Sequence, residues 1–455
     1  MDRRDYTILF LTTLAFIMHI SLLFTSNLSN YNLYDTDSWY FIKIWADTFG
    51  TTSIAMFNLL APLPPVISAI FTLSMYYLVT RLYNKTVGFY TGAMLAIGSG
   101  LLFQNGMFGI ADHHLLQVVL FTWLVMLLLL GMKEKQWRRI IPSPVLFVVL
   151  IPLSPTMIEL FAGLILLAIV IYSLSYLIQT KHYTLAIIAI AGLSIVSVAY
   201  IQAMNIISYI IQYWTIPYRH VLEWDWPDPI LFLIKFNVLP VILAIGFIYS
   251  LRRKIDSIEL VLLSITAITF GMALRYPRME YITLPFVVIL CSVYLNRYFT
   301  HKIAHAMVAI FVAVSLVFGC VVVSEMNAIK DSHSGIGEAL KFISNEPRGL
   351  VLSWGDYGYW VRNANQTEFA NVGWSNITHT AEIFTSNRST SKELIRKYGI
   401  THILITEQDM KFYPAMLRNS QSKGDYNTSM LSELIQNTSG YTPIYAKKGV
   451  MIYTT

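Results

Sequence analysis

Apolar runs of about 20 residues recur from the N-terminus to about residue 324 and then stop. A run of about 20 apolar residues can cross the hydrocarbon core of a bilayer as an α-helix. The pattern predicts eleven transmembrane helices, at 7–25, 55–80, 86–104, 114–132, 139–153, 156–178, 183–201, 229–250, 257–273, 279–296 and 304–324. After that, short apolar stretches alternate with polar residues, which is typical of an α/β-type soluble domain. We therefore expect a transmembrane domain at 1–324 and a soluble domain at 325–455.

The composition agrees with a membrane protein, because 55% of the residues are hydrophobic and only 13% are charged. Both cysteines, Cys291 and Cys320, lie inside apolar runs, which excludes a disulfide framework and a cysteine zinc site. The net charge is +6, but the basic residues do not gather in one patch of the soluble part. We therefore expect no nucleic-acid partner. The first apolar run has no convincing cleavage site and is interpreted as a retained helix.

The loop charges predict the orientation in the membrane. With eleven helices, fourteen basic residues fall on the N-terminal side, and the other side has five, namely Lys43, Arg219, Lys235, Arg275 and Arg278. Cytoplasmic loops are enriched in Lys and Arg. The sequence therefore predicts a multi-pass protein of the cell membrane with a cytoplasmic N-terminus and an extracytoplasmic C-terminal domain.

Two predicted outer loops contain residues suited to binding a divalent cation. The first contains "LYDTDSWYFIK", with Asp37 beside aromatic residues, and the second contains "GIADHHLLQ", with Asp112 and His114 at the start of a helix. Carboxylate and imidazole groups two positions apart can turn toward one ion. Taken singly, Asp37 also fits a solvated loop acid and Asp112 a helix N-cap. Together on one face they favour a metal site.

Further charged residues lie at the same predicted membrane face. "LRYPRMEYITLP" places Arg275 and Arg278 at a helix end, where ionisable residues are functional candidates. Arg278 could hold a phosphate through two hydrogen bonds, whereas Arg275 fits equally well as a cation reaching the interface. The long loop at 202–228 contains "YRHVLEWDWPDP". Its Glu223 could bind metal or substrate, or could belong to a plain amphipathic interfacial loop.

The soluble part contains an unusual cluster, "SWGDYGYW", from Ser353 to Trp360. Composition alone indicates a packed aromatic corner. Its position after a bundle with outer-face acids indicates instead an edge that binds a peptide.

These segments, in this order, resemble the catalytic subunit of oligosaccharyltransferase in its single-subunit bacterial and archaeal form, a C-type glycosyltransferase. The resemblance spans nearly the whole chain. It rests on "DSWY", on "ADHH", on Arg278 followed by Tyr281 and Pro285, on "WGDYG", and on the downstream stretches "NVGWSNITHTAEIFTS" and "LIRKYGITHILIT". It implies a C-type glycosyltransferase fold, a polytopic α-helical membrane protein of about 11 to 13 transmembrane helices with a C-terminal α/β-type domain.

The resemblance implies transfer of a glycan from a polyprenyl diphosphate carrier to the Asn side chain of Asn-X-Ser/Thr in acceptor polypeptides, with inversion. Asp37, Asp112 and His114 are the expected ligands of Mn²⁺ or Mg²⁺. Asp37, Glu223 and Arg278 are the expected catalytic residues. We further expect contacts with membrane lipid and a monomeric protein.

On the acceptor side, the resemblance implies that Trp354 and Asp356 bind the Ser or Thr hydroxyl and that Tyr357 belongs to the acceptor-binding segment, where it can also hold the fold. A second family motif is loosely present in "EQDMKFYPAM", which offers Lys411 and Met416, with Asp409 out of place. Gly355 stands where the family has a second Trp. That departure predicts either weaker binding of the hydroxyl or a compensating aromatic residue from elsewhere.

Two other functions remain open. A different polytopic glycosyltransferase, using a polyprenyl phosphate sugar to modify Ser/Thr or a lipid, would share the outer-loop acids but not "WGDYG". A lipid-linked glycan flippase or transporter would explain the helices and the arginine. It would not need acids and histidines on one side only, and the sequence shows no repeat of the transporter type.

Overall fold

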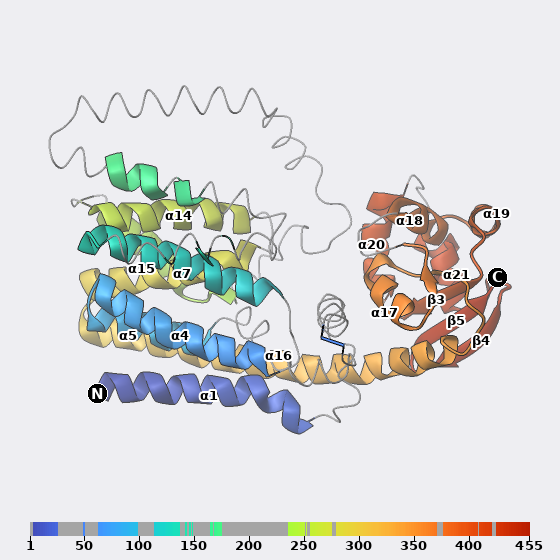
Figure 1. The fold of residues 1–455 in the computed structure, drawn as a ribbon, viewed down its shortest axis with the longest axis horizontal. Helices are drawn as coiled ribbons and strands as arrows, with labels where there is room; N and C mark the ends of the chain where they lie inside the picture. Colours follow the sequence, from blue (N-terminus) through green and yellow to red (C-terminus); the bar gives the residue numbers. More distant parts are fainter. Residues whose placement is uncertain are drawn as a thin grey trace. The chain divides into compact units, whose positions relative to one another are not determined.

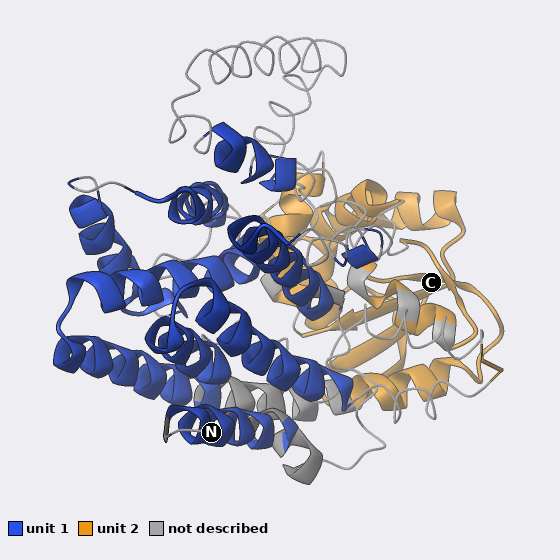
Figure 2. Ribbon diagram, turned by 60° about the vertical axis from the view of Figure 1, so that its left-hand side comes forward, with its two compact units in different colours: residues 1–22, 60–216, 225–323 blue, residues 23–59, 217–224, 324–455 orange. Residues whose placement is uncertain are grey.

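A computed structural model describes the helical bundle in part and most of the C-terminal region. The described residues are 3–25, 49–50, 62–98, 113–136, 142, 145–146, 148, 164–166, 168–174, 235–250, 252, 255–274, 279–370, 376–407, 409–420 and 425–455. The chain divides into two compact units. Unit 1 comprises residues 1–22, 60–216 and 225–323, and unit 2 comprises residues 23–59, 217–224 and 324–455 (Figure 2).

Unit 1 is a bundle of helices (Figure 1). Its described helices of ten or more residues are α1 (Arg3–Thr25), α4 (Leu63–Leu82), α5 (Lys85–Ile97), α7 (His113–Glu134), α13 (Leu239–Ser250), α14 (Ser257–Ala273), α15 (Met279–Tyr298) and the first part of α16 (His301–Ile343). Within the described part, the helices at 63–82, 115–134, 279–298 and 301–320 are long and apolar enough to cross a membrane. This confirms the predicted polytopic helical fold, whereas the number of eleven helices stays a prediction.

Helix α15 lies at the centre of the bundle and packs against α5, α7, α13 and α14. Its most apolar window is 89% buried by protein, whereas the corresponding window of α16 is only 28% buried. An apolar helix that protein does not cover is suited to face lipid. The two helices thus differ in role, since α15 forms the core and α16 presents side chains such as Val317 outward.

Capping groups and ion pairs fix one end of the bundle. Asn84 caps α5 by accepting hydrogen bonds from the backbone N–H groups of Thr86 and Val87, and Asp256 caps α14 by accepting one from Glu259. Ion pairs at this end join Arg81 to Glu134 at 2.9 Å, Lys85 to Asp5 at 2.9 Å, and Arg297 to Glu259. The ends of α4, α7 and α15 and the starts of α1, α5 and α14 are thereby held together.

Helix α16 continues 19 residues beyond residue 324, where the sequence analysis ends its last predicted transmembrane helix (304–324). Its final turns belong to unit 2 and bury Ile336, Ala339 and Ile343. Gly335 permits this packing, because a Cβ there would lie 2.9 Å from Lys448. The polar composition after residue 324 therefore marks a change of surroundings and not the end of a helix.

Unit 2 is built on a five-stranded sheet of order β2-β1-β3-β5-β4. The strands are β1 (Leu350–Leu352), β2 (Thr367–Glu368), β3 (His402–Thr406), β4 (Thr442–Lys447) and β5 (Val450–Thr454). The helices are α17 (Gly358–Asn363), α18 (Ile377–Thr385), α19 (Arg388–Tyr398), α20 (Asp409–Asn419) and α21 (Met430–Ile435), with short 3₁₀ turns η4 (Gly355–Tyr357) and η5 (Tyr426–Thr428). The mixture confirms the predicted α/β-type domain.

The sheet combines two kinds of pairing. Strands β1, β2 and β3 pair in parallel, whereas β5 pairs antiparallel with both β3 and β4. Strands β4 and β5 form a hairpin whose turn residues, Lys448 and Gly449, have φ of 50° and 72°. Two consecutive positive φ angles are typical of the tight turns that match the twist of a hairpin.

Candidate functional site

The candidate site of unit 2 lies at one edge of its sheet. Strand β1 leads directly into the "WGDYG" segment, and β3 leads into α20. The two strands are parallel neighbours, with Val351 paired to His402 and Leu352 to Ile403. The carboxyl ends of parallel strands lie at the same edge, where α/β proteins commonly bind ligands. This pairing brings together two segments that are about 50 residues apart in the sequence.

The aromatic residues of "WGDYG" are enclosed. Trp354 is only 1% exposed, and its ring stacks on that of Phe412 from α20, with centroids 6.3 Å apart and planes 24° apart. The ring of Tyr357 stacks on that of Trp360 at 5.3 Å. Gly355, which stands where the family has a second Trp, offers no ring to this segment. Phe412 supplies an aromatic contact to the neighbouring Trp354 instead.

Asp409 joins the two segments through hydrogen bonds. Its Oδ1 accepts a hydrogen bond of 2.7 Å from the Tyr357 hydroxyl, and its Oδ2 accepts one of 2.9 Å from the backbone N–H of Thr406. The Thr406 hydroxyl lies 3.2 Å from the same Tyr357 oxygen. Asp409 is fully buried, and burial raises its pKa to about 6, although the hydrogen bonds from Thr406 and Tyr357 act to lower it.

The spacing along α20 explains why these residues meet. Asp409, Phe412 and Met416 are separated by three and four positions and therefore lie on one face of the helix. Met416 is fully buried, in agreement with an inward face. By the family motif, Lys411 is the expected residue of this segment and Asp409 is out of place. The helical period of this face is the signal that would have selected Asp409 and Phe412.

A second buried pair lies in unit 1, at the start of the central helix. The ammonium of Lys235 is 2.7 Å from a carboxylate oxygen of Glu280, and the Glu280 side chain is only 1% exposed. Lys235 precedes α13 and follows the loop at 202–228, and Glu280 lies in the first turn of α15. The sequence alone indicates no partner for Lys235, which counts only as a cation of a predicted outer loop. The pair joins the residues just before α13 to the first turn of α15.

Comparison with solved structures shows which fold this is. The archaeal oligosaccharyltransferase AglB from Archaeoglobus fulgidus, in complex with an inhibitory peptide and a dolichol-phosphate, matches 99% of this chain with a TM-score of 0.65 and 14% identity. The match covers 74% of that chain. The chain has the fold of the archaeal oligosaccharyltransferase. This confirms the resemblance stated from the sequence motifs at the level of the fold.

Two further structures of the Archaeoglobus fulgidus oligosaccharyltransferase share this fold. The one tethered to an acceptor peptide with the NVT sequon has a TM-score of 0.57 at 15% identity, over 99% of this chain and 74% of that one. The complex with Zn and sulfate has a TM-score of 0.53 at 15% identity, over 92% of this chain and 64% of that one. No protein-family model and no curated protein sequence matches the chain.

Several predicted site residues of the oligosaccharyltransferase fold lie outside the described residues, namely Asp37, Asp112, Glu223 and Arg278. His114 lies in the first turn of α7, and Asp356 and Lys411 lie in η4 and α20, but their side chains are not described. Trp354, Tyr357 and Met416 are described and are buried in unit 2. Among the described residues, no group of three His, Cys, Asp or Glu side chains could hold a metal ion. The predicted metal ligands therefore remain predictions.

Proposed function

We propose that this protein is an oligosaccharyltransferase that moves a glycan from a polyprenyl phosphate or diphosphate carrier to the Asn side chain of Asn-X-Ser/Thr. The single observation that supports this most is the match of nearly the whole chain to a fold solved with a dolichol-phosphate and with an NVT-sequon peptide. The contact of "WGDYG" with α20 adds support, because it brings the two segments expected to bind the acceptor to one sheet edge. As in the sequence-based prediction, we place this protein in the cell membrane as a monomer with an extracytoplasmic C-terminal domain.

On the acceptor side, we assign recognition of the sequon hydroxyl to Trp354 and Asp356, with Tyr357 holding this acceptor-binding segment through Asp409. Asp356 lies in the η4 turn, between the buried rings of Trp354 and Tyr357, so its backbone is held on both sides. A turn fixed in this way can present a carboxylate to a hydroxyl donor. We also assign acceptor binding to Lys411 and Met416, which both lie on α20. A site of this kind rejects a peptide that lacks the hydroxyl, because its own polar groups are then left unpaired.

On the donor side, we assign the chemistry to the outer-loop residues of unit 1. The amide nitrogen of the sequon Asn attacks the anomeric carbon, the bond from that carbon to the phosphate oxygen breaks, and the configuration inverts. The nitrogen loses a proton to a carboxylate, for which Asp37 and Glu223 are the candidates. Arg278 holds a phosphate oxygen of the leaving group through its guanidinium.

The donor set of Asp37, Asp112 and His114 fits a divalent cation, because carboxylate oxygen and imidazole nitrogen are common ligands of Mn²⁺ and related ions. A solved neighbour in complex with Zn and sulfate supports a cation and an anion in this fold. When bound, such a cation would neutralise the charge that develops on the departing phosphate. The other residues bind and orient the amide and the carrier.

The test is a transfer assay with purified full-length protein, a lipid-linked glycan and a fluorescent Asn-X-Thr peptide, with Mn²⁺ or Mg²⁺ present. We expect Asp37→Ala to abolish transfer, whereas Asp35→Ala, in the same loop, retains it. A Gln-X-Thr peptide is the acceptor control, and chelation of the cation should stop the reaction. Undiminished transfer by Asp37→Ala would remove that residue from the site, and equal transfer to the Gln peptide would overturn the amide-specific function.

A further inference from the structure

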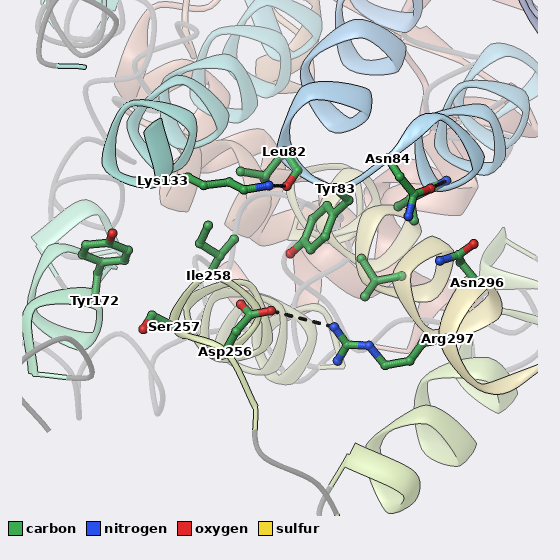
Figure 3. Close-up of a pocket in the computed structure, with 12 residues that line it drawn as sticks. Leu82, Tyr83, Asn84, Lys133, Tyr172, Asp256, Ser257, Ile258, Asn296 and Arg297 are labelled. Carbon is green, nitrogen blue, oxygen red and sulfur yellow. Dashed lines mark hydrogen bonds and ion pairs between the residues drawn. The ribbon is translucent and has the colours of Figure 1, made fainter. Parts of the chain in front are cut away.

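A cavity of about 430 Å³ opens at the end of the unit 1 bundle where α4 and α7 end and α5 and α14 begin (Figure 3). Residues from these helices and from α15 line it, and none of them takes part in the proposed transfer reaction. Helices α4 and α15, which are both long enough to span a membrane, reach this end. The cavity thus lies where lipid headgroups meet the ends of spanning helices.

One wall of the cavity is cationic. Lys133, in the last turn of α7, points its ammonium toward the end of α4 and donates one hydrogen bond to the backbone carbonyl of Leu82. An ammonium group has three N–H donors. Two donors of Lys133 are therefore available to a bound group, because the described residues offer this ammonium no further partner.

The opposite wall has the carboxylate of Asp256 beside the guanidinium of Arg297, as Figure 3 shows. The Asp256 side chain is 53% exposed, and its nearest cation is Arg297, at 3.8 Å. Arg297 is also engaged by Glu259, so its charge is shared between two carboxylates. No ion pair joins Lys133 to Asp256 in the described part of the chain. Lys133 on one wall thus has no carboxylate partner among the described residues, and Asp256 on the other wall has only a distant one-cation contact, with Arg297 of the same lining.

A buried hydroxyl lies between these walls. The Tyr83 hydroxyl points into the cavity toward Asp256 (Figure 3), and within the described residues it has no hydrogen-bond partner. Burial and the carboxylates of Asp256 and Glu259 hold the pKa of Tyr83 well above its usual range, so its proton is available to donate. A buried polar atom without a partner is costly, which favours a ligand atom that satisfies it.

We propose that this cavity binds a zwitterionic phosphate–ammonium group, the headgroup chemistry of a phosphoethanolamine lipid. Its phosphate meets the Lys133 ammonium and the Tyr83 hydroxyl, and its ammonium meets the Asp256 carboxylate. Leu82, Ile258 and Val293 add apolar lining suited to the carbon atoms next to the headgroup. The same chemistry exists in a soluble phosphoethanolamine ester, and the two sources are separated by experiment. The site is independent of the proposed glycan transfer.

The experiment is native mass spectrometry of the full-length protein in detergent, titrated with phosphatidylethanolamine, phosphatidylglycerol or glycerophosphoethanolamine. The variants are Lys133→Met, Tyr83→Phe and Asp256→Asn, the last of which keeps a helix-capping side chain. Lys302→Met is the matched control, because Lys302 is an exposed cation at the start of α16 outside the cavity lining. Unfolding temperature reports whether each variant folds, and Asp256→Ser replaces Asp256→Asn if that variant fails.

We expect Lys133→Met and Asp256→Asn each to weaken phosphatidylethanolamine binding about tenfold, as loss of a charge-assisted contact implies, and the control to bind like wild type. Asp256→Asn should also bind phosphatidylglycerol more tightly than wild type does, because the repelling carboxylate is gone. If glycerophosphoethanolamine displaces phosphatidylethanolamine when both are at equal concentration, the site is one for a soluble ester. If it does not displace the lipid, the site is one for the lipid. Equal lipid binding by Lys133→Met and the control, or no binding of either phosphoethanolamine compound, would overturn the proposal.

Discussion

The hydroxyl of Tyr357 donates a 2.7 Å hydrogen bond to the buried carboxylate of Asp409, 52 residues further along the chain. This bond links the turn after β1 to the start of the helix after β3. The bond can form because β1 and β3 are parallel neighbours, so the segments that follow the two strands begin at the same edge of the sheet. The orientation of the "WGDYG" turn therefore depends on the protonation and packing of a residue in a different segment.

The first prediction concerns the pH dependence of unit 2. The pKa of Asp409 is about 6 in the folded protein, above its value of 3.8 as a free side chain. Between these values the folded state keeps a proton that the unfolded state loses, so stability falls as the pH rises from about 4 through 6. The full effect is up to about 3 kcal/mol. Asp409→Asn, which cannot titrate, should remove this slope.

Hydrogen exchange of the β3 amides in full-length protein, corrected for the intrinsic exchange rate at each pH, measures this slope. His402 on the same strand acts in the opposite sense, because burial lowers its pKa and its contribution grows as the pH rises toward 6.5. The difference between wild type and variant cancels that contribution. Asp425→Asn, an exposed acid of unit 2, is the control. Parallel curves for wild type and Asp409→Asn would show that Asp409 does not titrate in this range.

The second prediction concerns Phe412. Because its ring stacks on that of Trp354, Phe412→Ala should leave Trp354 without its aromatic neighbour and raise the KM for the acceptor peptide several-fold. The KM for the lipid-linked glycan should stay unchanged. The local loss of stability should be about 1–2 kcal/mol, since Phe412 is only partly buried. Met410→Ala, at an exposed position of the same helix, is the control. An equal rise in both KM values would indicate general unfolding instead of a specific acceptor contact.

The membrane helices could be predicted from the sequence where charged or capping residues lie at both ends of an apolar run. The predicted helix at 257–273 coincides with α14, because Asp256 is the N-cap that fixes where this helix begins. The predicted helix at 279–296 differs from α15 by two residues. Hydrophobic pattern decides such elements locally, without information from the rest of the fold.

The contacts of the candidate site could not be predicted in the same way. The spacing of Asp409 to Lys411 does not fit the family motif, yet Asp409 accepts a hydrogen bond from Tyr357, which only the β1–β3 pairing brings near. The end of α16 was missed for a related reason. Its last turns are polar in composition and contain Gly335, and they stay helical because they pack on the sheet of unit 2. Tertiary contacts override local pattern at both places.

The third prediction concerns the buried pair of Lys235 and Glu280. Removing one partner leaves the other charge desolvated, so Glu280→Gln should lower the stability of the bundle by about 2–4 kcal/mol. The double variant Lys235→Met with Glu280→Leu should recover much of that loss, because no charge is left unpaired. Thermal unfolding of the detergent-solubilised protein measures all three proteins. The more exposed pair Arg81–Glu134 provides the comparison, and Arg81→Met should lower the stability far less than Glu280→Gln does. If Glu280→Gln costs no more than Arg81→Met, the pair does not stabilise the bundle.

The fourth prediction uses two glycines with opposite surroundings. A Cβ at Gly246 of α13 would lie 2.0 Å from the ring of Tyr294 on α15, whereas a Cβ at Gly271 of α14 would meet no atom within 4 Å. Small residues let membrane helices approach closely, and a methyl group at Gly246 must displace either the ring or the helix. Gly246→Ala should therefore destabilise the bundle by about 1–3 kcal/mol, the usual range for overpacking. Gly271→Ala should stabilise it by up to about 1 kcal/mol, because alanine favours the helix. Thermal unfolding of both variants measures the difference. Similar shifts for the two variants would show that α13 and α15 are not in this close contact.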